Sequence, residues 1–166
     1  MIRKIEKAIG LTLIRLGSLR PRWSTKFAIF WYGRWGMNLL GRPNYISATA
    51  WFDGADYSLI SISEGCTISS ETSFLTHDWS VYNIGRALRD ANVKVVARNR
   101  AIKLESYCFI GRGAILMPGA TIGEGAVVGA GSVVRGIVEP FTIVMGNPAV
   151  KVADAKKYYK KELRNL

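Results

Sequence analysis

The sequence has few of the residues from which metal sites and disulfide frameworks are built. Its 166 residues include two cysteines, Cys66 and Cys108, and one histidine, His77. One histidine and two cysteines cannot supply a usual structural zinc site, which takes four Cys or His ligands. Both cysteines fall at a small position of the repeat described below, so we interpret them as core residues. We therefore expect a protein of the reducing cytoplasm that needs no metal.

Acidic residues are nearly absent from the first 45 positions, which carry nine Lys or Arg against Glu6 alone. Residues 46–152 carry nine residues of each sign, and the tail from Ala153 adds five basic and two acidic residues. A nucleic-acid partner would require basic residues across one folded surface, so this distribution argues against one. Basic ends around a neutral middle fit either an anionic membrane surface or solvated helices.

Long apolar runs are also missing. Residues 2–16 predict an amphipathic helix, because four apolar residues recur on one stripe: Ile5, Ile9, Leu13 and Leu16. The aromatic stretch 27–35 is cut by Arg34, well short of the ~20 apolar residues of a spanning helix. Two interpretations of this N-terminal segment stay open. It caps the open end of the fold, or it makes peripheral contact with the cytoplasmic face of the inner membrane.

The sequence does contain a six-residue repeat between Leu104 and Gly146. An aliphatic residue returns at every sixth position: Leu104, Ile110, Leu116, Ile122, Val128 and Val134. A small or slim residue follows each by four positions: Cys108, Ala114, Ala120, Ala126, Ser132 and Val138. A helix cannot give this period, which is typical of β-helix solenoids. Glycine directly follows three of the aliphatic residues, at positions 111, 123 and 129, and we interpret it as adopting backbone angles that other residues resist.

Upstream the repeat is weaker and then stops. Ile62, Ile68 and Phe74 keep the six-residue step, whereas Asp53 and Asp56 predict an irregular first coil. Residues 77–101 fit no hexapeptide and predict a loop extruded from the solenoid, a common position for a binding face. A floppy connector is the alternative, but the apolar residues in this segment argue against it. The predicted organisation is a cap over 1–45, a β-helix over 46–152 and a basic helix over 153–166.

His77 is the residue best suited to proton transfer near neutral pH, and it lies where the repeat breaks into the loop. A lone histidine is more often structural, and that alternative stays open. Neither cysteine lies where a nucleophile is needed, which favours direct transfer in a ternary complex.

Three runs carry a resemblance to a known family: residues 110–123, residues 128–134, and the turn Gly146-Asn-Pro-Ala. They resemble hexapeptide-repeat acetyltransferases, above all the maltose and galactoside O-acetyltransferases and the acetyltransferases of exopolysaccharide synthesis. The resemblance covers about residues 60–151. It implies a left-handed parallel β-helix of triangular section and a homotrimer, with acetyl-CoA and acceptor meeting between subunits.

The resemblance also implies roles for individual residues. His77 would be the general base, and the backbone N–H of Arg112 would stabilise the oxyanion. Asp78 is a candidate for holding the other ring nitrogen of His77. Cofactor contacts fall on five residues, Gly111, Ala130, Ser132, Arg135 and Lys151, and acceptor contacts on Asp78, Trp79 and Asn83.

The expected activity is acetyl-CoA-dependent O-acetylation of a sugar hydroxyl in bacterial surface polysaccharide biosynthesis. The basic, aromatic N-terminus favours that setting, because such glycans are built on lipid carriers. Two alternatives stay open: an N-acetyltransferase acting on an amino sugar, and a β-helix scaffold without catalysis.

Overall fold

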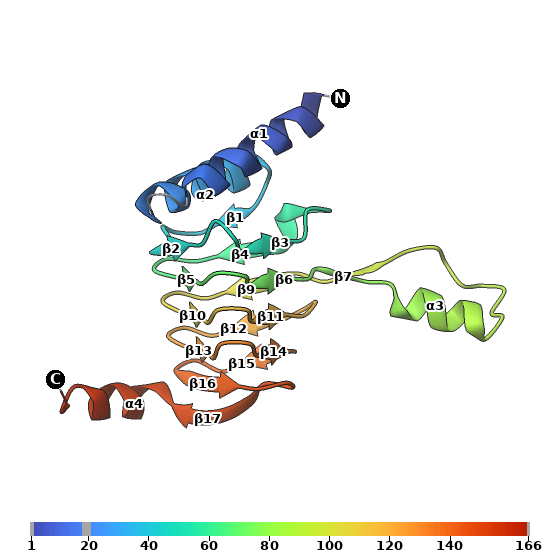
Figure 1. Cartoon of the computed structure of the whole chain (residues 1–166). Coiled ribbons are helices and arrows are strands. Elements are labelled where there is room, and N and C mark those ends of the chain that lie inside the picture. The colour runs from blue at the N-terminus through green and yellow to red at the C-terminus, as the bar shows by residue number, and fades with distance from the viewer. Residues whose placement is uncertain (1, 18–20, 166) are drawn as a thin grey trace.

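Two helices lie across one end of a stack of short parallel strands (Figure 1). The computed structural model describes residues 2–17 and 21–165. Helix α1 (Ile2–Leu16) confirms the amphipathic helix expected there, and α2 (Pro21–Arg34) carries the aromatic stretch. Proline suits the first position of α2, because its missing N–H has no helical partner at that position.

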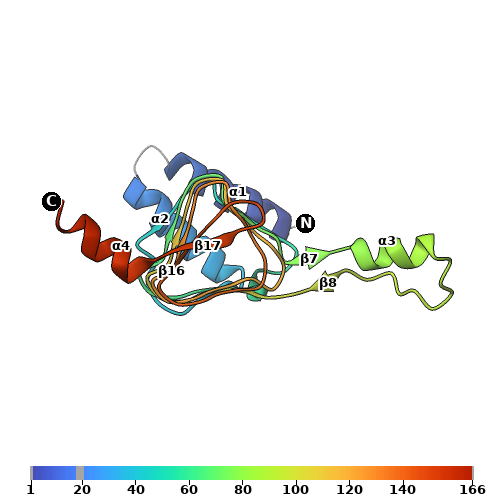
Figure 2. The ribbon, with the colours of Figure 1, turned by 90° about the horizontal axis from the view of Figure 1, so that it is seen from below.

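The strands form three parallel sheets, which the chain visits in turn. The first sheet contains β1 (Asn38–Leu39), β4 (Ile60–Ile62), β9 (Ile102–Leu104), β12 (Thr121–Ile122) and β15 (Ile137–Val138). The second contains β2 (Tyr45–Ile46), β5 (Thr67–Ile68), β10 (Phe109–Ile110), β13 (Val127–Val128) and β16 (Thr142–Met145). The third contains β3 (Trp51–Phe52), β6 (Ser73–Phe74), β11 (Ile115–Leu116) and β14 (Val133–Val134). Seen along the stack, the coils have a roughly triangular outline (Figure 2).

The interior of this triangle is filled by the residues of the repeat. The aliphatic residues of the six-residue step are all buried: Leu104, Ile110, Leu116, Ile122, Val128 and Val134. The small positions are buried as well, from Cys108 and Ala114 through to Val138. Cys66 and Cys108 are free thiols in this core, as the sequence predicts. The hexapeptide repeat thus encodes the interior of a parallel β-helix.

The glycines after the aliphatic residues have a different purpose from the one expected. Gly111 and Gly129 do not have positive φ angles, which belong instead to Gly113 and Gly131 in the turns that follow. A Cβ atom at Gly111 would lie 2.6 Å from the backbone nitrogen of Ala130 in the next coil. Glycine is therefore required at this position because the neighbouring coil lies too close for a side chain.

An arm leaves the solenoid between β6 and β9, where the sequence predicts an extruded loop. It contains β7 (His77–Asp78), α3 (Ser80–Ala87) and β8 (Arg98–Asn99), and β7 pairs antiparallel with β8. The backbone N–H of Arg100 donates to the Thr76 carbonyl at 2.8 Å and joins the two sides of its base. The arm projects from one corner of the triangle, on the side opposite to α4 (Ala155–Glu162; Figure 2).

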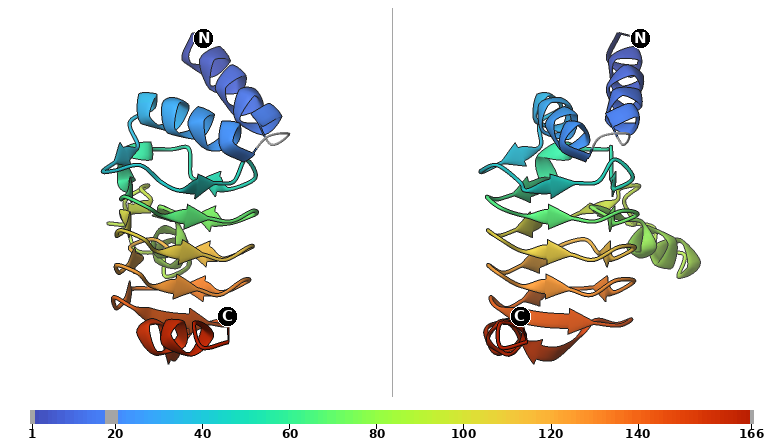
Figure 3. Two further views of the ribbon diagram at one scale, coloured as in Figure 1. Left: turned by 90° about the vertical axis from the view of Figure 1, so that its left-hand side faces the viewer. Right: turned by 60° about the vertical axis from the view of Figure 1, so that its left-hand side comes forward.

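The C-terminal end differs from the expectation in two respects, an additional strand and a later start of the helix. Strand β17 (Val150–Asp154) turns back antiparallel to β16, where no strand was predicted. The basic helix expected from Ala153 begins at Ala155 instead, because the Asp154 carboxylate accepts a hydrogen bond of 2.9 Å from the Lys157 N–H. Figure 3 shows this helix at the end of the stack opposite to α1 and α2.

The first coil is irregular, as Asp53 and Asp56 predict. It contains the 3₁₀ helix η2 (Tyr57–Leu59), which Asp56 caps by accepting from the Ser58 N–H at 2.9 Å. Aromatic rings fill the space between this coil and the helices: Tyr32 lies 4.8 Å from Phe52 and 5.4 Å from Tyr57, centroid to centroid. Aromatic packing therefore takes over where the aliphatic stack ends.

Candidate active site

His77 lies at the corner of the triangle where the chain leaves β6 for the arm. We name this corner, formed by residues 53–59, 75–101, 117–120 and 135–136, the His77 corner. The His77 side chain is 37% exposed, so solvent and ligands reach it, and its Nδ1 forms a hydrogen bond to Oδ2 of Asp53. Since that bond occupies Nδ1, the other ring nitrogen, Nε2, is left to accept a proton.

Asp53 is buried and held by several donors. Its Oδ2 accepts from the backbone N–H of Thr76 at 3.2 Å and from the Thr76 hydroxyl at 2.8 Å. Its Oδ1 accepts from the Ala55 N–H at 3.3 Å. Burial by itself would raise the pKa of Asp53, but the hydrogen bonds from Thr76, His77 and Ala55 outweigh it and lower the pKa. Asp53 therefore stays ionised and favours the tautomer with the proton on Nδ1.

The stacking of coils explains this contact. Phe52 pairs with Phe74 in the third sheet, so Asp53 follows its strand directly above the segment that leads to His77. Asp78, the residue expected as a possible orienting group, lies elsewhere. Its carboxylate accepts from the Ser80 N–H at 2.8 Å and from the Ser80 hydroxyl at 2.9 Å, at the start of α3. Asp53, and not Asp78, holds the His77 ring.

Most of the other residues implied by the resemblance lie at a different corner. We name the corner that joins the second sheet to the third, formed by residues 47–50, 69–72, 111–114 and 129–132, the Arg112 corner. Gly111, Arg112, Ala130 and Ser132 all lie there. The Arg112 carbonyl accepts from the Gly131 N–H at 2.8 Å, while its own N–H has no hydrogen-bond partner within the described residues. This N–H meets one requirement of an oxyanion donor.

The remaining predicted residues are spread over three places. Arg135 lies at the His77 corner and, with Arg98, helps to lower the pKa of Asp78, mainly depressed by the hydrogen bonds from Ser80. Trp79 and Asn83 lie on the arm, both exposed, and Lys151 is exposed on β17. A single chain therefore does not bring His77 together with the Arg112 corner, because they lie at different vertices of the triangle.

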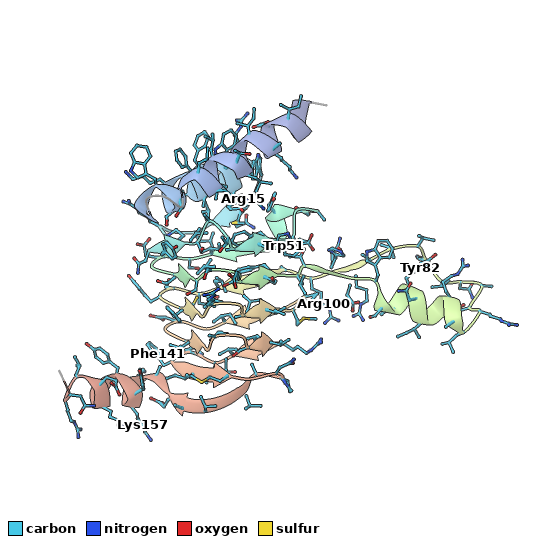
Figure 4. All side chains as sticks on the ribbon, viewed as in Figure 1. Arg15, Trp51, Tyr82, Arg100, Phe141 and Lys157 are labelled. Atoms are coloured by element: carbon cyan, nitrogen blue, oxygen red, sulfur yellow. The ribbon has the colours of Figure 1, made fainter. Side chains whose placement is uncertain are left out.

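A cavity of about 670 Å³ lies between α1 and the first coil, where no motif of the sequence indicates one. Its walls include Arg15, Tyr32, Trp51, Gly54 and Tyr57, together with Lys7. The Lys7 ammonium donates to the Gly54 carbonyl at 3.2 Å and lies 5.0 Å above the Tyr57 ring. Figure 4 shows Arg15 on α1 above Trp51 on the first coil. Because Gly54 follows Asp53, this basic and aromatic cavity adjoins the residue that holds His77.

Comparison with known proteins supports the repeat and the resemblance. The family described as Bacterial transferase hexapeptide (six repeats) matches residues 101–136. Protein CapG of Staphylococcus aureus is 37% identical over 112 residues, which cover 68% of this chain and 62% of CapG. The chain therefore spans less than two thirds of that relative's length.

Solved structures resemble the whole chain. A hexapeptide-repeat-containing acetyltransferase from Vibrio cholerae, VCA0836, superposes with a TM-score of 0.60 at 22% identity, covering 93% of each chain. A galactoside acetyltransferase in complex with coenzyme A superposes with a TM-score of 0.61 at 16% identity, covering 95% of this chain and 84% of the other. The left-handed parallel β-helix expected from the sequence is confirmed, as is the resemblance to hexapeptide-repeat acetyltransferases.

Proposed function

We propose that this protein transfers the acetyl group of acetyl-CoA to a sugar hydroxyl, in the biosynthesis of a bacterial surface polysaccharide. The hydrogen bond between His77 and the buried carboxylate of Asp53 is the observation that carries the proposal. It orients the ring and selects the tautomer in which Nε2 is the proton acceptor, at the base of the arm. The VCA0836 structure that was solved with acetyl-CoA bound has the same fold, which supports the choice of co-substrate.

The proposed reaction proceeds without an acyl-enzyme. His77 takes the proton of the acceptor hydroxyl on Nε2 as that oxygen attacks the thioester carbonyl carbon of acetyl-CoA. The carbonyl oxygen becomes an oxyanion, which the N–H of Arg112 stabilises. The carbon–sulfur bond then breaks, and the CoA sulfur receives the proton from His77. The products are a sugar acetate ester and free CoA, and His77 returns to its neutral form.

The proposed site includes a second subunit, and we assign the assembly as the homotrimer that the family resemblance implies. His77 and the N–H of Arg112 lie at different corners of one chain, so one of the two must come from a neighbouring subunit. In that arrangement the cofactor contacts are Gly111, Ala130 and Ser132 of one subunit, with Arg135 and Lys151 as phosphate partners. The arm supplies Asp78, Trp79 and Asn83 for the acceptor, and its exposed apolar residues favour contact with the neighbouring subunit.

We further assign the cavity beside Asp53 to the acceptor. Trp51 is half exposed there and offers a flat face to a sugar ring, while Lys7 and Arg15 bring two positive charges. Sugars that carry a phosphate or carboxylate fit this lining better than neutral sugars do.

An assay of CoA thiol release tests the proposal. The full chain is incubated with acetyl-CoA and a panel of nucleotide sugars and glycan fragments, with the same panel lacking protein as a control. We expect release that depends on the acceptor, faster for anionic sugars, and a product ester that mild base cleaves. A product that survives mild base indicates an amide and therefore the N-acetyltransferase alternative. No saturable acetyl-CoA binding in a thermal-shift titration indicates a scaffold.

A further inference from the structure

The outer side of the two N-terminal helices is apolar, although it faces away from the solenoid. We name this surface the roof. It consists of five exposed side chains: Ile5, Ile9 and Leu16 on α1, and Trp23 and Phe30 on α2. Phe30 is 61% exposed and Ile5 is 54% exposed. Ring-bearing side chains stand on the side of these helices that points away from the coils (Figure 4).

The roof is not needed to close the solenoid, because the inner sides of the same helices do that. Ile14, Ala28 and Tyr32 are buried between the helices and the first coil. The Thr25 hydroxyl accepts from the Ile46 N–H at 3.1 Å and fixes α2 on β2. The apolar residues of the roof are therefore additional to those that cap the fold.

An apolar outer surface is unexpected at this end of a solenoid. Terminal elements of repeat proteins usually present a polar outer face, which keeps the chains from associating end to end. A cluster of large exposed apolar side chains instead marks a surface that binds a membrane or another protein. A shallow groove between Ile5, Ile9 and Trp31 continues this surface across both helices.

The charges of the same two helices indicate what covers the roof. Lys26 is exposed on α2, and the Arg34 side chain remains 59% exposed although it pairs with Glu6. Within residues 1–45, nine basic residues face a single acidic one. A second copy would bring the same positive charge to the contact and be repelled, whereas an anionic lipid surface would attract it.

We propose that the roof binds the surface of an anionic lipid bilayer. Its aromatic and aliphatic side chains enter the boundary between headgroups and acyl chains, while the basic residues meet lipid phosphates. None of the helices in the described ranges combines the length and hydropathy that crossing a bilayer requires. In the proposed arrangement, α1 and α2 lie in the plane of the surface with the roof toward the lipid. This binding holds the mouth of the cavity under α1 close to lipid-linked molecules.

Co-sedimentation with vesicles tests this inference without any acetyl-transfer substrate. The full chain is mixed with vesicles of phosphatidylcholine and phosphatidylglycerol, and separately with vesicles of phosphatidylcholine alone. We expect sedimentation with the anionic vesicles only, weakening as salt is raised. The double variant Ile9→Ser/Phe30→Ser should lose binding by about tenfold or more, because both exposed apolar side chains are removed.

The matched control is Tyr158→Ser/Leu163→Ser, which removes one aromatic and one aliphatic side chain of similar exposure at the C-terminal end of the stack. This variant should bind anionic vesicles like the unchanged chain, and circular dichroism should show all three proteins folded. Equal sedimentation with both vesicle types, or unchanged binding by the roof variant, overturns the inference. So does roof-dependent doubling of the mass in light scattering without lipid, which would identify a second copy as the partner.

Discussion

The regular coils from β9 to β16 and the interrupted coils above them are built from the same repeat but differ inside. In the regular coils the interior holds aliphatic side chains and small residues, such as Leu116 and Ala120. In the interrupted coils the chain buries a carboxylate, Asp53, beneath the helices and beside the half-buried His77. Asp53 is the one buried carboxylate among the described residues. The hydrogen-bonded pair of Asp53 and His77 therefore lies where the repeat is broken.

Removing the proposed base, His77, should give the largest effect on activity with little effect on stability. His77→Ala should lower acceptor-dependent CoA release by about 10²–10⁴-fold, because no other group accepts the hydroxyl proton. The melting temperature should fall only modestly, because Thr76 and Ala55 still donate to the buried Asp53 carboxylate. Steady-state kinetics with differential scanning calorimetry measures both. Unchanged turnover with the physiological acceptor contradicts the general-base role.

In the regular coils we expect a substitution to lower stability while activity is kept. Leu116→Ala leaves a cavity at a fully buried position and should destabilise the fold by about 2–5 kcal/mol. Activity per folded molecule should change little at low temperature, because Leu116 points into the core whereas the proposed site residues lie at the corners of the coils. Denaturant titration measures the loss. Val95→Ala, on the exposed arm, is the control and should stay within about 0.5 kcal/mol. Equal destabilisation by both variants would remove the distinction between scaffold and arm.

Asp53 is buried in the interrupted coils and holds the His77 ring, so its replacement should lower turnover through that ring. Asp53→Asn should lower kcat by about 10–100-fold, because the amide no longer favours the proton on Nδ1. The pH profile of kcat and the ¹⁵N shifts of the His77 ring should change with it, which a purely structural role does not require. Asp90→Asn is the control, an exposed carboxylate that accepts from the Asn92 N–H. A normal pH profile in Asp53→Asn contradicts the positioning role.

The smallest effect is expected at Arg112, although it lies in the proposed site. Its side chain pairs with Glu71 at 2.8 Å, and the two side chains are 68% and 58% exposed. Arg112→Gln should therefore cost at most about 1 kcal/mol of stability. Turnover should be retained, because the backbone N–H is the proposed oxyanion donor. A large loss of turnover would show that the guanidinium itself acts, and Glu71→Gln serves to separate that from the ion pair.

The β-helix could be predicted from the sequence because the six-residue repeat is a local pattern. Each aliphatic residue, such as Ile110, is followed four positions later by a small residue. Both positions lie within one strand and its adjoining turn, so no long-range contact is needed to recognise them. The arm was predictable for the same reason, as a gap in the pattern after Phe74. Strand β17 was missed because its pairing with β16 is antiparallel and lies outside the repeat.

The partner of His77 was not predictable in the same way. Asp53 lies 24 positions earlier, and the contact depends on how the irregular first coil stacks on the second. Asp53 was visible only as a break in the apolar register. The register pair Phe52 and Phe74 would have placed Asp53 opposite Leu75, two residues before His77, had the first coil been aligned with the second.

The arm also changes how the chain can fold. Below it, partners in adjacent coils are 18 residues apart, as in Phe109 with Val127. Across it, Phe109 pairs with Thr67, 42 residues away. Closing the longer loop costs about 0.8 kcal/mol more chain entropy, because that cost grows with the logarithm of loop length. The lower coils should therefore nucleate first, and the upper coils that carry His77 should assemble onto a template that is already formed.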